Sequence, residues 1–168
     1  MSSSRLLAFV CLFVLFLIQN ALVYVFPSKA PALVLIGVLF FALTEGRSFG
    51  AFAGMWGGLL MDLYGLGRPG FTMAAYALVG FSSGFVSSKI FQDSWLAEIV
   101  LPFASLYAVM LAELALMRSQ IGDPAGPAAL AESFRPWPLF TTVLAAPWLF
   151  SRLRRIWPRR RRRWAPVH

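Results

Sequence analysis

Hydrophobic residues occur along this chain in long, nearly continuous runs, without the regular polar positions that cover the outside of a soluble protein. Short breaks of glycine, proline and charged residues divide them into six apolar segments. These cover about residues 6–26, 31–44, 49–66, 71–91, 95–118 and 136–157. Apart from the short second segment, each approaches the roughly 20 residues with which a helix crosses a bilayer. The pattern therefore predicts six transmembrane helices.

The first segment could be mistaken for a secretory signal. It is too long for the apolar core of a signal peptide, and no small-residue cleavage site precedes Pro27. We therefore expect it to stay in the mature protein.

Composition supports a membrane protein. Of the 168 residues, 59% are hydrophobic and only 13% are charged, and the mean hydropathy is +0.71, far from the usual globular values. We expect an all-α integral membrane protein: a compact bundle of six transmembrane helices over residues 1–157, followed by a basic tail over residues 158–168.

Basic residues are distributed unevenly between the two sides of this bundle. The larger share, including all the C-terminal arginines, falls on the side of the two termini, which the positive-inside rule places in the cytoplasm. We therefore predict a multi-pass protein of the bacterial inner membrane. The C-terminal arginines are a topology anchor, a contact for anionic lipid headgroups or a contact for a cytoplasmic filament protein. Their place beside an apolar segment argues against a nucleic-acid partner. They are Arg152, Arg154, Arg155, Arg159, Arg160, Arg161, Arg162 and Arg163.

Small residues recur at every fourth position in three neighbouring segments, which lets helix backbones approach closely in lipid. The stripe of the third segment predicts an internal packing seam and a central position for that helix. The other two stripes are candidate faces for a partner helix. The stripes are Gly46, Gly50, Gly54 and Gly58; Gly80, Gly84 and Ser88; and Ala104, Ala108 and Ala112.

Two acidic residues and three arginines are expected near the outer ends of their helices. They are Asp62, Glu113, Arg68, Arg118 and Arg135. A buried charge in lipid costs several kcal/mol, so such groups should pair or face inward. This outer-side cluster is either a set of ion pairs that locks the helix ends or a polar pocket or docking surface open to the outside.

The chain lacks the side chains of an enzyme site. Its one histidine is His168, and the sequence has neither metal-ligand spacing nor a serine with a plausible base partner. We expect neither catalysis nor a cofactor.

The most specific stretch of the chain covers residues 46–84. It contains Gly50-x-x-x-Gly54-x-x-x-Gly58-Leu59-Leu60-Met61-Asp62, then Gly67-Arg68-Pro69-Gly70-Phe71 and Tyr76-Ala77-Leu78-Val79-Gly80-Phe81. With six apolar segments in a chain of this length, this stretch resembles the MreD family of rod shape-determining proteins.

The resemblance implies a non-enzymatic scaffold of the bacterial cell-elongation machinery, which supports the regulation of peptidoglycan synthesis and cell shape. Its main partner would be MreC, which has one transmembrane helix and a periplasmic part. MreB, RodA and the transpeptidase of RodA would work beside it, and a second copy of the chain is a further candidate partner.

The family is similar in fold to the substrate-binding subunits of energy-coupling-factor transporters. The alternative function is therefore vitamin-type uptake. The first segment lacks the Ala-x-x-x-Ala patch with which many such subunits dock to their coupling protein, which favours the scaffold.

Overall fold

The computed structural model describes residues 3–26, 30–64, 70–87, 95–120 and 136–157. Within these ranges it contains six helices and no strand, as predicted for an all-α chain. The helices are α1 (Ser3–Val25), α2 (Leu33–Glu45), α3 (Arg47–Tyr64), α4 (Phe71–Ser87), α5 (Trp95–Gln120) and α7 (Pro136–Ile156). Each matches one predicted apolar segment, and most ends agree within three residues because glycine, proline and charges mark the breaks.

Helix α2 occupies the centre of the bundle. Every residue from Leu33 to Ala42 is buried, and α2 contacts α1, α3, α4, α5 and α7. Phe40 packs edge-on against Phe41 and against Phe150 of α7, with ring centroids 5.5 and 5.6 Å apart. The glycine stripe predicted that α3 is central, but the central helix is α2. Among the helical residues whose burial is described, only those of α2 form a long stretch that is apolar and buried on every side, from Leu33 to Ala42.

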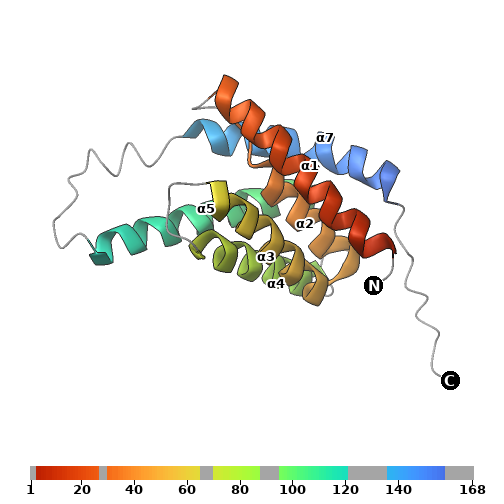
Figure 1. The fold of residues 1–168 in the computed structure, drawn as a ribbon, viewed down its shortest axis with the longest axis horizontal. Helices are drawn as coiled ribbons and strands as arrows, with labels where there is room; N and C mark the ends of the chain where they lie inside the picture. Colours follow the sequence, from red (N-terminus) through yellow and green to blue (C-terminus); the bar gives the residue numbers. More distant parts are fainter. Residues whose placement is uncertain (1–2, 27–29, 65–69, 88–94, 121–135, 158–168) are drawn as a thin grey trace.

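The other helices surround α2. Helices α3 and α4 form the closest pair, while α5 packs mainly against α7. In Figure 1, α1 runs diagonally across the front, α7 lies above, and α3 and α4 lie below. Helix α1 begins and α7 ends at the same end of the bundle.

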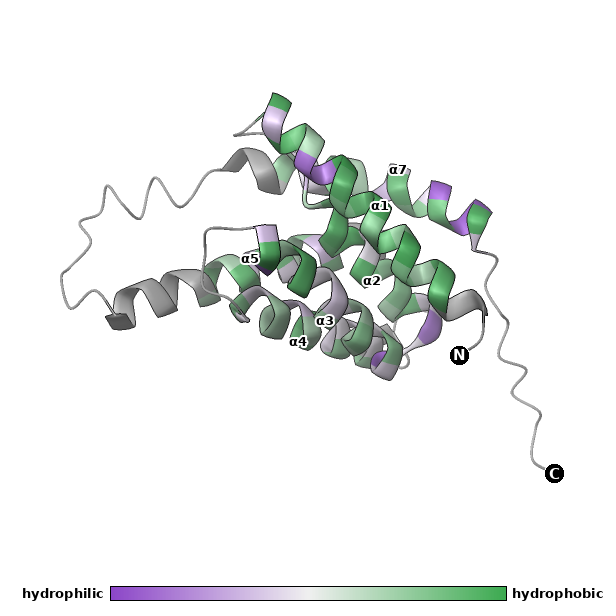
Figure 2. Ribbon diagram, in the orientation of Figure 1, coloured by the Kyte–Doolittle hydropathy of each residue, from purple (hydrophilic) through white to green (hydrophobic). Residues whose placement is uncertain are grey.

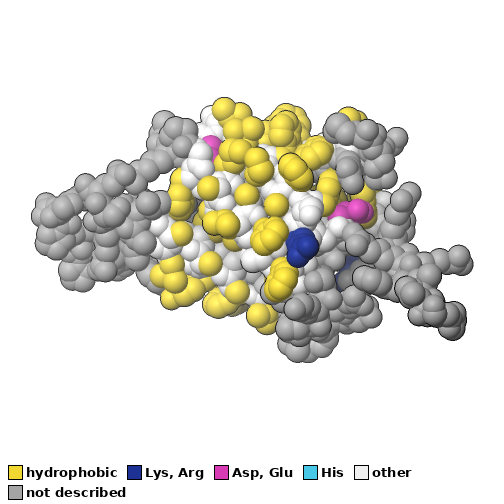
Figure 3. Space-filling model, turned by 90° about the horizontal axis from the view of Figure 1, so that it is seen from below, with side chains coloured by type: hydrophobic (Ala, Val, Ile, Leu, Met, Phe, Trp, Pro, Cys, Tyr) yellow, Lys and Arg dark blue, Asp and Glu magenta, His cyan; other side chains and the backbone are white. Residues whose placement is uncertain are grey.

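Hydrophobic side chains also cover much of the outside. Large apolar residues are exposed on α1, α3, α4, α5 and α7, among them Leu63, Leu78 and Leu144, which are 76%, 69% and 70% exposed. Figure 2 shows helices that are hydrophobic over most of their length. The face in Figure 3 carries hydrophobic side chains across its described surface and few charged ones.

Among the described helices, one meets the combined length and composition expected of a membrane span, over residues Leu6–Val25 of α1. Shorter apolar helical stretches cover Leu33–Glu45, Phe71–Phe85 and Val100–Ala112. The structure thus gives an all-helical bundle with one clear candidate span.

Candidate functional site

The glycine stripe of α3 lies against the backbone of α4. A Cβ atom on Gly50 would lie 2.5 Å from the carbonyl oxygen of Gly80, and one on Gly58 would lie 2.5 Å from the Cα of Met73. A Cβ on Gly54 would overlap the carbonyl oxygen of Tyr76. Only hydrogen atoms fit between the two backbones, so these three glycines set the distance between α3 and α4.

The small residues of α4 complete the same seam from the other side. A Cβ on Gly80 would overlap the carbonyl oxygen of Gly50, and one on Gly84 would lie 2.5 Å from the Cα of Arg47. Gly80 and Gly84 are therefore used within the bundle and are not available to a partner helix, contrary to the expectation from sequence. Ser88 lies outside the described residues.

Two further glycines have roles that their spacing did not reveal. Gly46 ends α2 with a φ of 95°, a backbone conformation that favours glycine, so it forms the turn before α3 and is not part of that helix. Gly57 faces α2, where a Cβ would lie 2.9 Å from Cγ1 of Val34. Helix α3 therefore has two glycine faces, one toward α4 and one toward α2.

Asp62, in the last turn of α3, caps the first turn of α4. Its Oδ2 accepts hydrogen bonds from the backbone N–H groups of Gly70 at 2.9 Å and Met73 at 3.0 Å, and its Oδ1 accepts one from Thr72 at 3.2 Å. These N–H groups have no partner within the helix itself, and a carboxylate also matches the positive end of the helix dipole. Within the described residues, Asp62 therefore acts as a lock between two helix ends.

The rest of the predicted outer-side cluster is not described at side-chain level. Arg68 and Arg135 lie outside the described residues, as do the side chains of Glu113 and Arg118. The choice between an ion-paired cluster and an open pocket therefore remains a prediction for these four residues.

The start of α2 is capped by two other helices. The backbone N–H of Val34 donates to Oε1 of Gln19 in α1 at 2.9 Å, and that of Ala32 donates to Oγ1 of Thr142 in α7 at 3.0 Å. The N–H of Leu33 donates to the carbonyl of Pro31 at 2.9 Å. These caps could not be predicted from the sequence, because Ala32 and Thr142 lie 110 positions apart. The available signal was the adjacent pair of amides, Gln19 and Asn20, within an otherwise apolar stretch of α1.

The alanine stripe of α5 lies on an exposed face. Ala104 and Ala108 are exposed, and Ala112 is half-buried. Phe103 and Tyr107 flank the stripe, and their rings are stacked with centroids 6.5 Å apart and an interplanar angle of 3°. The opposite side of α5 faces the bundle through the buried residues Pro102, Ser105 and Val109. Unlike the stripe of α4, this one is open to a partner.

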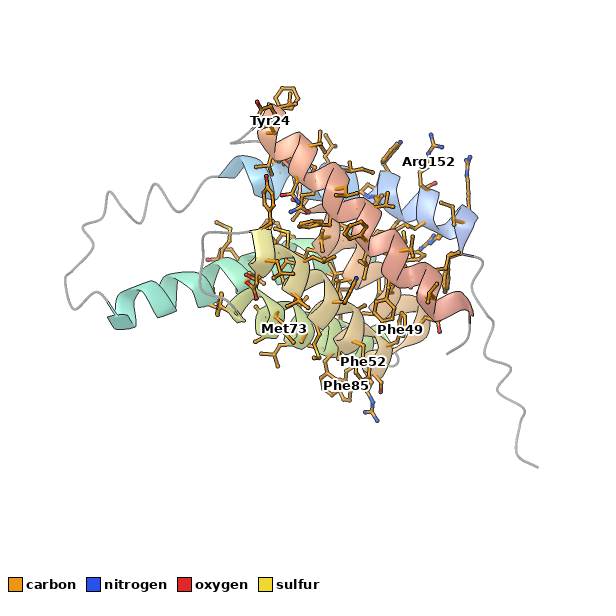
Figure 4. The ribbon with its side chains drawn as sticks, in the orientation of Figure 1. Tyr24, Phe49, Phe52, Met73, Phe85 and Arg152 are labelled. Atoms are coloured by element: carbon orange, nitrogen blue, oxygen red, sulfur yellow. The ribbon has the colours of Figure 1, made fainter. Side chains whose placement is uncertain are left out.

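The described part of the C-terminal arginine cluster lies in the last two turns of α7. Arg152, Arg154 and Arg155 are all exposed, and Figure 4 shows Arg152 projecting from α7 away from the other helices. The end of α7 is held by Trp157, whose Nε1–H donates to Glu45 at 3.1 Å and whose ring packs edge-on against Phe41. The arginines from Arg159 to Arg163 lie outside the described residues.

The described side chains contain no group of three His, Cys, Asp or Glu residues that could hold a metal ion. Comparison of the chain with protein-family models, with curated proteins and with solved structures gave no match in any of the three.

Proposed function

We propose that this chain is a multi-pass membrane protein whose six helices form a scaffold of the MreD type. Support for the membrane comes from the exposed apolar residues on five of the helices. Soluble monomers rarely expose contiguous apolar patches above a few hundred Å², whereas contact with lipid tails carries no such cost.

The short α2 fits this placement. Its 13 residues give a length of about 20 Å at about 1.5 Å per residue, less than the roughly 30 Å of a bilayer's hydrocarbon core. In lipid, unpaired backbone N–H groups cost several kcal/mol each. The caps from Gln19 and Thr142 allow α2 to begin inside the bundle, where water would not reach those groups.

The scaffold function rests on the exposed face of α5. Val100, Phe103, Tyr107 and Leu111 are between 39% and 54% exposed, and they line the same face as Ala104 and Ala108. Small residues between large apolar ones form the kind of surface on which a second transmembrane helix packs closely. We assign this face to the single transmembrane helix of MreC.

In this function the protein performs no chemistry. It holds the helix of MreC in the inner membrane, so that the periplasmic part of MreC lies where wall synthesis by RodA and its transpeptidase is regulated, with MreB on the cytoplasmic side.

The transporter alternative has less support. It requires a polar pocket near the outer helix ends, with Asp62 as one wall. Both oxygens of Asp62 already accept hydrogen bonds from the start of α4, which makes this carboxylate a poor ligand for a small molecule.

Co-purification of MreC with the full-length chain from membranes tests the scaffold. Ala104→Trp and Ala108→Trp place a large ring on the docking face and should lower the recovered MreC at least tenfold, because they prevent close helix approach. Leu78→Trp is the matched control: Leu78 is also exposed, at 69%, but it lies on α4, and its variant should recover MreC like the wild type.

Normal MreC recovery by both Ala104→Trp and Ala108→Trp would refute α5 as the docking face. Failure of the wild-type chain to recover MreC would refute the scaffold function itself. Saturable binding of a vitamin by the purified chain would favour the transporter.

A further inference from the structure

The exposed face of α7 carries a row of apolar side chains that ends in a positively charged residue. Phe140, Leu144 and Trp148 are 69%, 70% and 63% exposed. They recur every four residues, so they follow one face of the helix, and Arg152 continues the same row and is also exposed. The core side of α7 is formed by other residues, namely Thr142, Ala146, Leu149, Phe150 and Leu153.

Three exposed polar residues lie at the charged end of this row: Ser151, Arg152 and Arg155. The guanidinium carbon of Arg152 lies 5.4 Å from the centroid of the Trp148 ring, within the range of a cation–π contact. Ser151 and Arg155 are four residues apart and therefore also neighbours on the helix surface. Within the described part of the chain, neither Arg152 nor Arg155 has a carboxylate partner.

Trp157 connects the helix end that carries these polar residues to the bundle. Trp157 donates its Nε1–H to Glu45 at the end of α2, and its ring centroid lies 5.6 Å from that of Phe41. The Trp157 side chain therefore holds the end of α7 against the end of α2, and the two guanidinium groups extend from this attached helix end.

The dimensions of the row match one leaflet of a membrane. Phe140 and Trp148 are eight residues apart, which corresponds to about 12 Å along the helix. Half of a bilayer's hydrocarbon core measures about 15 Å. With the row against acyl chains, Trp148 lies one helical turn below the headgroups, and Arg152 and Arg155 lie at the headgroup level, where their long side chains reach the phosphates.

We infer that this face of α7 is a binding site for an anionic phospholipid of the inner leaflet. The acyl chain lies along Phe140 and Leu144, and the phosphate is held by Arg152 and Arg155, with the Ser151 hydroxyl as a further donor. The inference rests on the membrane placement in the proposed function but not on the docking of MreC. The charge of the site selects phosphatidylglycerol over a zwitterionic lipid.

Brominated lipids test this site, because bromine quenches a tryptophan that it touches. The full-length chain is reconstituted in phosphatidylcholine vesicles with a minor fraction of phosphatidylglycerol, and the bromine is placed on the acyl chains of one lipid or the other at equal mole fraction. The chain has six tryptophans, so the fluorescence of Trp148 is obtained by subtracting the fluorescence of the same protein carrying Trp148→Phe. Trp148 should be quenched more by brominated phosphatidylglycerol than by brominated phosphatidylcholine.

The arginines should account for that preference. Loss of one guanidinium, in Arg152→Gln or Arg155→Gln, should reduce the preference about fivefold, and loss of both should abolish it. Arg47→Gln is the matched control, because Arg47 is an exposed arginine at the start of α3 and its removal should leave the preference unchanged.

Three results would overturn the site while leaving the membrane placement intact. They are equal quenching by the two lipids, a preference that survives in the double variant, and an equal loss in Arg47→Gln. If neither lipid quenches Trp148, this face of α7 does not contact acyl chains, and both the site and the membrane placement of α7 fail.

Discussion

The side-chain carbonyl of Gln19 in α1 accepts a 2.9 Å hydrogen bond from the backbone N–H of Val34 in the first turn of α2. Gln19 is only 6% exposed, and its Nε2 lies 3.5 Å from Sδ of Met61 in α3. One buried amide thus contacts two neighbouring helices. Gln19 thereby supplies an acceptor at the start of α2, where the first backbone N–H groups have no acceptor within the helix.

Replacement of Gln19 by methionine should destabilise the bundle by about 1–3 kcal/mol, because it leaves the N–H of Val34 buried without an acceptor while keeping a similar side-chain volume. The measurement is the unfolding transition of the detergent-solubilised protein, followed by circular dichroism. Asn20→Leu is the control. Asn20 donates to the carbonyl of Phe16 in its own helix, and its loss should have little effect. Equal stability of Gln19→Met and wild type would refute the capping role.

Gly54→Ala and Gly57→Ala form a matched pair on α3. Both gain about 1 kcal/mol in helix propensity. The new methyl group of Gly54→Ala overlaps the backbone of α4 at Tyr76, whereas that of Gly57→Ala meets only the side-chain methyl groups of Val34 and Val38, at 2.9 and 3.2 Å.

Backbone cannot yield as a side chain can, so Gly54→Ala should lower the unfolding free energy by at least 1–3 kcal/mol, clearly more than Gly57→Ala. Unfolding transitions of the two variants in the same detergent give the comparison. If Gly57→Ala is the more damaging change, α3 does not pack against α4 through Gly54.

Asp62→Ala removes all three acceptor contacts at the start of α4 and should cost about 1–2 kcal/mol. Asp62→Asn keeps one acceptor oxygen and loses the charge, so its stability should fall between that of Asp62→Ala and the wild type. The control is Leu63→Ala in the same turn, since Leu63 is 76% exposed and its truncation should change stability little. Thermal unfolding of the four proteins gives the order, and a stability of Asp62→Ala equal to wild type would contradict the cap.

Trp157→Phe keeps an aromatic ring against Phe41 but removes the hydrogen bond to Glu45. The expected loss is about 0.5–1.5 kcal/mol. Because Glu45 also makes other contacts, a double-mutant cycle with Glu45→Ala isolates the interaction between the pair. Additive effects of the two changes would show that α7 is not held to α2 through this bond.

The all-helical fold and the positions of the six described helices could be predicted from the sequence. Apolar runs of this length can bury their backbone polar groups only as helices, and Gly46, Pro27 and the charged stretches mark their ends. Even the short α2 was found, because its 13 residues are apolar throughout. The stripe at Gly50, Gly54 and Gly58 was visible from spacing alone.

The partners of those helices could not be predicted. In a soluble protein, the contrast between apolar and polar positions tells which side of a helix faces the core. Here apolar residues surround most helices, so Phe40 in the centre and Leu78 on the outside are equivalent in sequence. For the same reason, the glycines of α4 were assigned to a partner helix, and α3 was placed at the centre.

The sequence by itself determined that the chain forms apolar helices, where they begin and end, and that small residues bring some of them close together. Only the tertiary structure decided that Gly80 and Gly84 face α3, that Asp62 caps α4, and that Gln19 and Thr142 cap α2. These contacts join residues from different helices, up to 110 positions apart. Local patterns cannot encode them, because they depend on how the helices rotate and cross in three dimensions.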